Sequence, residues 1–126
     1  MRPTPAPQVV EWLEAQQADD LRLPSISVTE LVYGAHRLPD GKRKRELMSR
    51  VALLVERTFK DKISDFDARS AVVCGALMAE HPEIEIEDRY ADFQIAAIAL
   101  AGGFELATRN TKDFTFSNLR LINPWG

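Results

Sequence analysis

Apolar residues along this chain follow two alternating patterns. Spacings of three to four positions, as in Leu47, Val51 and Leu54, indicate one face of a helix, whereas short uninterrupted apolar runs indicate buried strands. Helices are expected at residues 8–16, from 27 onward, from 42 to about 59, from 67 to 81 and from 92 to 102. Strands are expected at residues 21–26, 63–66, 104–107 and 119–122. Their alternation predicts an α/β fold with a parallel sheet covered by helices on both faces.

Polar residues and glycines mark the expected ends of these helices. Residues 27–30 read Ser-Val-Thr-Glu, the pattern of a capping box in which the first and fourth side chains cap the helix reciprocally. Asp67 is well placed as the N-cap of the helix that follows it. Asp92 precedes an apolar stretch and is expected near a helix start, and the glycine pair at 102–103 ends that helix.

Length and composition narrow the class of protein. With 126 residues, of which 45% are hydrophobic and 28% charged, the chain is expected to form a single globular domain over residues 1–126. The net charge of −3 shows no global basic field for nucleic acid, although a metal ion or a local patch can supply positive charge. The single cysteine excludes an intrachain disulfide and fits a reducing cytoplasm. No apolar run reaches membrane-spanning length.

Four polar side chains are candidates for one shared site. Ligands of open α/β sheets bind outside the carboxyl ends of the strands, where Asp92 and Asn110 or Asp113 could face one crevice. Each also has a structural interpretation. Asp92 could interact with the helix dipole, Glu30 could serve only in the capping box, and Asn110 and Asp113 could form a turn after a strand.

The remaining chemically active residues favour structural roles. His36 and His81 have no cysteine or carboxylate at ligand spacing, so a zinc site is not expected. Cys74 falls on an apolar helix face and is expected in the core. The basic run at residues 42–45 is most simply a solvated face, although it could contact phosphate. No glycine-rich phosphate loop follows any expected strand, which argues against a nucleotide-binding or receiver-like domain.

Four stretches together resemble one known family. They are LPSISVTELVYGAHRLPDGKRKREL, ADFQIAAIALAGGFELATRN, the following TKDF and the closing LRLINPW. In this order they resemble the PIN-domain toxins of the VapC type, most closely the FitB-like or plasmid-stability branch. The resemblance covers essentially the whole chain.

This resemblance implies a metal-dependent ribonuclease. PIN domains present three or four acidic residues around one or two Mg²⁺ or Mn²⁺ ions, which cut RNA phosphodiesters; hard divalent ions prefer such oxygen ligands. Glu30 corresponds to the second acidic residue and Asp92 to the third. The fourth position falls on Asn110 or Asp113, between which the resemblance does not choose. Candidate contacts to phosphate or to the metal ligands are Thr108 and Arg109.

The chain departs from the family pattern at its beginning. Family members start with a strand ending in an acidic motif, placed directly before a segment like MRPTPAP, whereas this sequence starts with that segment. The central first strand and its aspartate are therefore expected to be missing, either because the coding start lies upstream or because the toxin has decayed. The stretch before Asp92 is also longer and more acidic than in the family.

Two functions follow as hypotheses. The first is an endoribonuclease toxin of a type II toxin–antitoxin module, expected to be inactive as given because the first catalytic aspartate is absent. The alternative is a catalytically dead PIN remnant that still binds its antitoxin. In both cases the resemblance implies a cytoplasmic protein with a small DNA-binding antitoxin as partner, RNA as substrate of the full-length form, a homodimer and no membrane contact.

Overall fold

A computed structural model describes residues 6–15, 21–107, 114 and 121–122 of the chain. The chain divides into two compact units, residues 1–63 and 64–126. The expectation of one domain over residues 1–126 stays a prediction.

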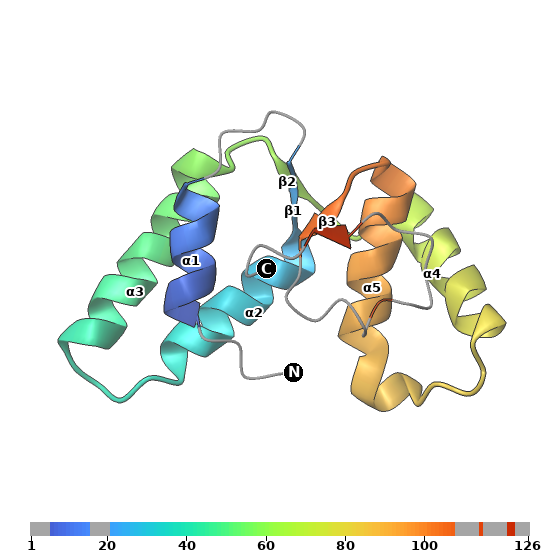
Figure 1. Ribbon diagram of the computed structural model, residues 1–126, viewed down its shortest axis with the longest axis horizontal. Coiled ribbons are helices and arrows are strands. Elements are labelled where there is room, and N and C mark those ends of the chain that lie inside the picture. The colour runs from blue at the N-terminus through green and yellow to red at the C-terminus, as the bar shows by residue number, and fades with distance from the viewer. Residues whose placement is uncertain (1–5, 16–20, 108–113, 115–120, 123–126) are drawn as a thin grey trace. The chain divides into compact units, whose positions relative to one another are not determined.

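The first unit is largely helical (Figure 1). It contains helices α1 (Ala6–Glu14), α2 (Ser25–His36) and α3 (Lys42–Leu53) and the π-helical segment η1 (Leu54–Thr58). Strand β1 (Leu23–Pro24) pairs with β2 (Ile63–Ser64), which lies at the boundary between the units. These elements confirm the expected order of helices and strands in this part of the chain.

Helix α2 begins two residues earlier than predicted. Pro24 is its N-cap, with φ −63° and ψ 141°, and makes no side-chain capping hydrogen bond. Ser27 therefore lies inside the first turn, and the predicted capping box of Ser27 and Glu30 is wrong. The reason is local: proline has a fixed φ and no N–H group, which suits a helix start, and the residues from Ser25 onward can all adopt helical angles. The same early start shortens the predicted strand 21–26 to β1.

The long helix after Gly41 is confirmed, with one irregularity at its end. Residues 54–58 form a π turn, closed by a hydrogen bond from Phe59 N to Leu54 O at 2.8 Å. A π turn contains one residue more per turn than an α-helix. In an α-helix, Phe59 would point about 140° away from Leu54, because each residue turns the helix by about 100°. The wider turn lets both side chains be buried, at 3% and 0% exposure.

One hydrophobic core holds the first unit together. The helices bury one face each, as their apolar spacing predicts, and α1 packs on α2, α3 and η1. An ion pair also joins α1 to α3: Arg50 donates from Nη2 to Glu14 Oε1 at 2.6 Å and from Nε to Glu14 Oε2 at 3.1 Å. The buried members of this core are Val10, Leu13, Leu23, Leu31, Ala35, Leu47, Val51, Leu54 and Phe59.

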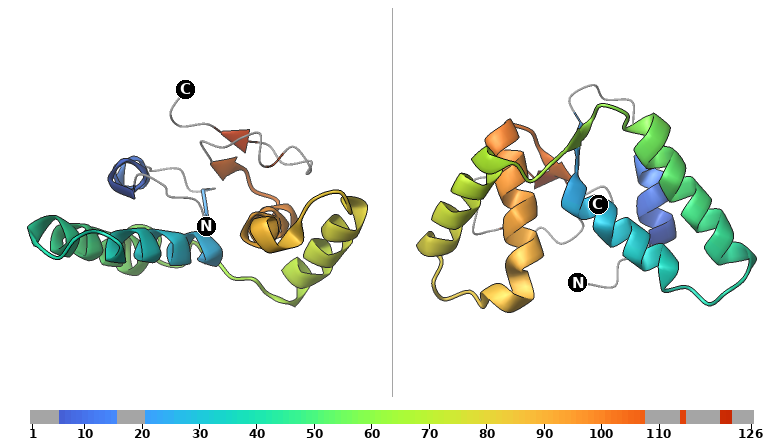
Figure 2. Two further views of the ribbon diagram at one scale, coloured as in Figure 1. Left: turned by 90° about the horizontal axis from the view of Figure 1, so that it is seen from below. Right: turned by 180° about the vertical axis from the view of Figure 1, so that it is seen from behind.

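Two packed helices form the frame of the second unit. Helix α4 (Ala68–Glu80) lies against α5 (Ile86–Gly102), and Figures 1 and 2 show them side by side. Asp67 caps α4 as predicted, because its Oδ1 accepts a hydrogen bond from Ser70 N at 2.8 Å. Strands β3 (Leu106–Ala107) and β4 (Leu121–Ile122) then pair in parallel, in the register Leu106 with Leu121 and Ala107 with Ile122.

Helix α5 starts six residues before the predicted start at Asp92. Its first turn holds residues 86–89, and it follows α4 directly through a short turn, with no strand between the two helices. The expectation that Asp92 lies near a helix start is therefore wrong. The acidic stretch before it can continue the helix because glutamate has a high helix propensity. Gly103, with φ 70°, ends α5 in the left-handed conformation, as predicted.

The strands are shorter than their apolar runs predicted. The four described strands have two residues each and form two separate two-stranded sheets, β1–β2 and β3–β4. The parallel arrangement is confirmed for β3 and β4. No helix of the described chain is long and apolar enough to cross a membrane.

Candidate functional site

Asp92 is a buried carboxylate in the middle of α5. Its residue exposure is 4%, and it begins a stretch of α5 in which nearly every side chain to Ala99 is buried. Burying a carboxylate is costly unless it is paired. Arg89, one turn earlier, donates from Nε to Asp92 Oδ2 at 2.8 Å. Because Asp92 lies well inside the helix, the interpretation that it serves the helix dipole at the N-terminus does not hold.

Sequence reasoning missed Arg89. The sequence contains one indication of this pair, because Arg89 and Asp92 are three positions apart. That spacing places two side chains on one helix face, but only if both residues belong to the helix. The predicted start at Asp92 excluded that arrangement. The guanidinium fixes one carboxylate oxygen in a charge-assisted hydrogen bond and so restrains the side chain of Asp92.

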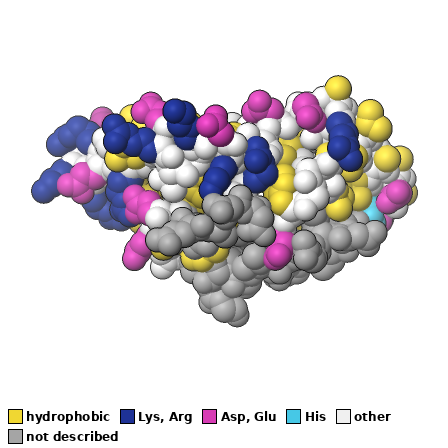
Figure 3. Space-filling view, turned by 90° about the horizontal axis from the view of Figure 1, so that it is seen from above, with side chains coloured by type: hydrophobic (Ala, Val, Ile, Leu, Met, Phe, Trp, Pro, Cys, Tyr) yellow, Lys and Arg dark blue, Asp and Glu magenta, His cyan; other side chains and the backbone are white. Residues whose placement is uncertain are grey.

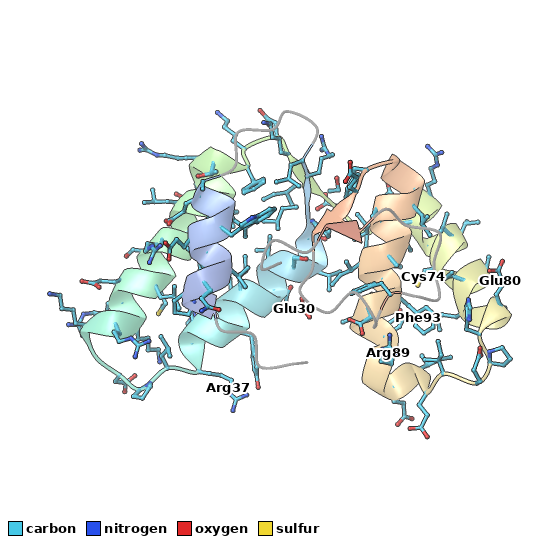
Figure 4. All side chains as sticks on the ribbon, viewed as in Figure 1. Glu30, Arg37, Cys74, Glu80, Arg89 and Phe93 are labelled. Carbon is cyan, nitrogen blue, oxygen red and sulfur yellow. The ribbon has the colours of Figure 1, made fainter. Side chains whose placement is uncertain are left out.

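Glu30 lies in the middle of α2, in the first unit (Figure 4). Its side chain is partly buried, and the residue is not without an interaction partner. Without the capping box, Glu30 has no role at the start of the helix. The structural interpretation that competed with a metal-binding role is thereby removed.

The other predicted site residues are not part of the described chain. Asn110 and Asp113, between which the fourth position was left open, and the candidate contacts Thr108 and Arg109 all lie outside the described residues. Glu30 and Asp92 belong to different units. That these side chains share one crevice stays a prediction.

The donor chemistry of Glu30 and Asp92 fits a hard divalent cation, because both supply carboxylate oxygens. The described residues contain no group of three or more His, Cys, Asp or Glu side chains that could hold a metal ion. The predicted ligand set therefore needs a side chain from outside the described ranges. Cys74 is not expected to bind a softer metal ion. Its exposure is 3%, and burial raises the pKa of its thiol, which disfavours the thiolate that binds such ions.

Comparison with known proteins decides the family. A model of the PIN domain matches residues 2–119 of the chain. The chain belongs to the PIN-domain family. Among curated relatives, this PIN domain is 36% identical to the plasmid stability protein StbB of Pseudomonas syringae pv. tomato, over 98% of this chain and 89% of StbB. It is 35% identical to the VapC ribonuclease Y4jK of Sinorhizobium fredii, over 93% of this chain and 84% of the relative.

A toxin and its solved structures are also similar. The chain is 32% identical to toxin FitB of Neisseria gonorrhoeae, over 99% of this chain and 90% of FitB. A structure described as FitAB bound to an IR36 DNA fragment matches with a TM-score of 0.76 at 32% identity, over 99% of this chain and 87% of the matched chain. The crystal structure of FitAcB from the same organism also gives 0.76, at 31% identity, over 98% of this chain and 89% of the matched chain. The PIN-like α/β fold predicted from the sequence is thereby confirmed.

Proposed function

We propose that this PIN domain is a metal-dependent endoribonuclease toxin of a type II toxin–antitoxin module. Membership of the PIN family and similarity to a protein named VapC ribonuclease support RNA cleavage. Similarity to FitB, and to the FitAB complex with DNA, supports a partner protein that binds DNA. Glu30 and Asp92, with Asn110 or Asp113, are the proposed ligands of Mg²⁺ or Mn²⁺.

The buried Asp92 carries this proposal. A carboxylate at 4% exposure costs folding free energy, and here it serves neither as a cap nor as a surface charge. Arg89 holds one of its oxygens, so the side chain is restrained before any ligand binds. Such hydrogen bonds to ligating carboxylates are typical of metal sites, and their removal typically costs about 10–100-fold in affinity or activity.

Each proposed group has a defined task. A bound divalent ion would supply an activated water and neutralise charge on the phosphate. Asp92 and Glu30 would provide the negative charge that attracts the ion, and Arg89 would keep Asp92 in a fixed rotamer. Thr108 and Arg109 remain candidate contacts to the phosphate.

A cleavage assay tests the proposal. Labelled single-stranded RNA is incubated with the chain in Mn²⁺, in Mg²⁺ and in EDTA. Asp92→Asn and Glu30→Gln are each expected to reduce metal-dependent cleavage by more than the roughly 10–100-fold that loss of a ligand's hydrogen-bond partner costs, because each removes a charged ligand itself. Glu56→Gln, which neutralises an exposed carboxylate of the first unit, is the matched control and should cleave normally. Full cleavage by Asp92→Asn would refute the assignment.

The same assay separates the second candidate, an antitoxin-binding module without catalysis. If the chain of 126 residues cleaves no RNA with either metal but co-purifies with its co-expressed antitoxin, binding is its function. The inactivity expected for the chain as given stays a prediction until that measurement. The homodimer implied by the resemblance also stays a prediction, which light scattering of the purified chain would test.

A further inference from the structure

Positive charge is concentrated around one end of the first unit, where α2 ends and α3 begins. Residues 37–50 contain six Lys or Arg and two Asp or Glu, which gives this segment a net charge of +4. The whole chain has a net charge of −3, so the remaining residues together carry −7. In Figure 3, Lys and Arg side chains crowd the left-hand end, where α3 lies. We name this the α2–α3 cationic surface and define it by Tyr33, Arg37, Lys42, Arg43 and Arg45.

Several cations of this surface are available to a ligand. Arg37, Arg43 and Arg45 are exposed and have no carboxylate partner in the part of the chain that the structure describes. The side chain of Lys42 is 84% exposed, and its Nζ lies 3.8 Å from Glu46 Oε1, a weak surface contact.

Other cations of the same segment are already engaged. Arg50 is held by Glu14 in two hydrogen bonds, and Lys44 donates to Asp40 at 3.1 Å. Arg50 and Lys44 are therefore not counted as part of the α2–α3 cationic surface. An open hollow of about 410 Å³ adjoins it, and its lining residues are Arg45, Glu46, Ser49 and Arg50.

An exposed aromatic ring lies within this cationic surface. Tyr33 is 47% exposed on α2, and the guanidinium carbon of Arg37, one turn later, lies 5.5 Å from the centroid of its ring. Nucleic-acid bases stack on such rings, and arginine offers a planar fork of donors that matches phosphate. Tyrosine and arginine also occur at protein–protein contacts, but Lys42 would be unusual at the centre of one, and four cations without a carboxylate among the defining residues favour a polyanion. The chemistry of this surface therefore fits a single-stranded polyanion with bases.

These cations oppose the stability of their own helix. Lys42, Arg43 and Arg45 occupy the first turn of α3, where the helix dipole favours anions, and Gly41 provides no side-chain cap. An anionic ligand across this surface would offset that unfavourable charge.

We propose that the α2–α3 cationic surface binds the phosphate backbone of single-stranded RNA, with Tyr33 stacking on a base. The proposal deepens the proposed ribonuclease function, because it gives the RNA a contact surface apart from the metal ligands. Arg43, Arg45 and Lys42 contact phosphates, and Arg37 supports the ring of Tyr33 and a neighbouring phosphate.

Fluorescence anisotropy with a labelled single-stranded RNA oligonucleotide tests the proposal, in EDTA so that no cleavage occurs. Each phosphate contact contributes about 0.7 to the slope of log affinity against log salt, so losing two weakens binding by about 25-fold at ~0.1 M salt and hardly at all at ~1 M. Arg43→Gln/Arg45→Gln is expected to show this loss and a slope smaller by about 1.4. Arg57→Gln/Lys60→Gln, which removes two exposed cations beyond the other end of α3, is the matched control.

Substitutions of Tyr33 should affect RNA binding in a different way. Tyr33→Leu is expected to weaken binding about fivefold or more without changing the salt slope, and Tyr33→Phe is expected to bind normally, because stacking needs the ring and not the hydroxyl. Unchanged melting temperatures verify that these exposed substitutions preserve the fold.

Three outcomes would overturn the proposal. The first is that the Arg43/Arg45 variant binds RNA at low salt as tightly as the wild type. The second is that the Arg57/Lys60 control loses as much RNA affinity as that variant. The third is that the Arg43/Arg45 variant loses as much affinity for labelled polyglutamate as for RNA, which would indicate a general anion-binding surface. Because binding is measured in EDTA, it is independent of cleavage. Normal RNA binding by the Arg43/Arg45 variant would overturn this proposal alone, whereas absence of metal-dependent cleavage by the wild type would bear only on the ribonuclease proposal.

Discussion

At the scale of single residues, the pair of Arg89 and Asp92 combines a structural and a chemical role. The carboxylate side chain is 5% exposed and the guanidinium side chain 26%, so the pair lies between the interior and the solvent. A partly buried pair is poorly screened by salt, and its two members depend on each other. Any substitution that removes only one of them leaves an uncompensated charge.

Replacing Arg89 by glutamine should therefore destabilise the chain by about 1–3 kcal/mol, because Asp92 loses a charge-assisted hydrogen bond. The double variant Arg89→Gln/Asp92→Asn should recover part of that loss, because no buried charge then remains. Urea unfolding at pH 7 of the two single variants and the double variant gives the coupling energy. A coupling energy of zero would show that the hydrogen bond contributes nothing to stability.

Asp67 gives a prediction about pH. The hydrogen bond from the Ser70 backbone N–H holds the pKa of the Asp67 carboxyl below its usual value. A lowered pKa in the folded state means that Asp67 stabilises the protein above its unfolded pKa of about 3.9, and that this stabilisation is lost as the pH falls through the lower folded value. Asp67→Ala should melt at a lower temperature than the wild type at pH 7, and the difference should shrink in acid below about pH 4.

Asp67→Ser is the control for that experiment. Serine also caps helices but carries no charge, so its stability should lack this acid dependence. A difference between wild type and Asp67→Ala that persists unchanged in acid would contradict the assignment.

At the scale of elements, the end of α5 depends on the smallest side chain. A Cβ atom on Gly102 would lie 2.5 Å from Cε1 and 2.8 Å from Cδ1 of Phe104, a ring that is only 9% exposed. Gly103 follows in the left-handed conformation with open space around it. The turn from α5 into β3 therefore requires glycine at both positions, for two different reasons.

Gly102→Ala should destabilise the chain by about 1–3 kcal/mol, because the buried ring of Phe104 must move. Gly75→Ala is the matched control. Gly75 lies inside α4, and no atom lies within 4 Å of the position that a methyl group would take there, so alanine should stabilise the helix by about 0.4–1 kcal/mol. Thermal unfolding of both variants should give shifts of opposite sign. Shifts of the same sign would show that the close contact at Gly102 is relieved without cost.

The helices could be predicted from sequence because their signals are local. The apolar spacing of Leu47, Val51 and Leu54 and the cap at Asp67 depend only on neighbouring residues. The starts of α2 and α5 could not be predicted, since acidic and hydroxyl residues fit both a cap and a first turn. Strand lengths depend on pairing with distant segments, which a single sequence does not show. The sequence analysis therefore placed Asp92 in the right helix but at the wrong position within it, and it did not predict that this carboxylate is buried.

At the scale of the whole molecule, the proposed metal ligands come from both compact units. Glu30 belongs to one unit and Asp92 to the other, and both are proposed ligands of one ion. An ion that binds only the folded chain stabilises it by RT ln(1 + [L]/Kd), about 2.7 kcal/mol at a concentration 100 times Kd. Metal binding should therefore be visible in the stability of the entire chain.

Mn²⁺ is expected to raise the melting temperature of the wild-type chain, and Glu30→Gln and Asp92→Asn should each abolish that rise. Both carboxylates are needed because neither supplies enough oxygen ligands alone. Differential scanning fluorimetry with and without Mn²⁺ makes the measurement, with Glu56→Gln as the control for lost charge. A rise that survives in Glu30→Gln would remove Glu30 from the site.

The π turn at the end of α3 has a consequence for how this chain can vary over evolution. A turn with one residue in excess is a place where a single-residue insertion can be absorbed without displacing the core on either side. Loss of the exposed Glu56 would shorten the interval from Leu54 to Phe59 to four positions, which an ordinary α-helical turn also places on one face. We therefore expect loss of one codon to be tolerated here, whereas the same change beside Val51 would rotate every later core residue out of register.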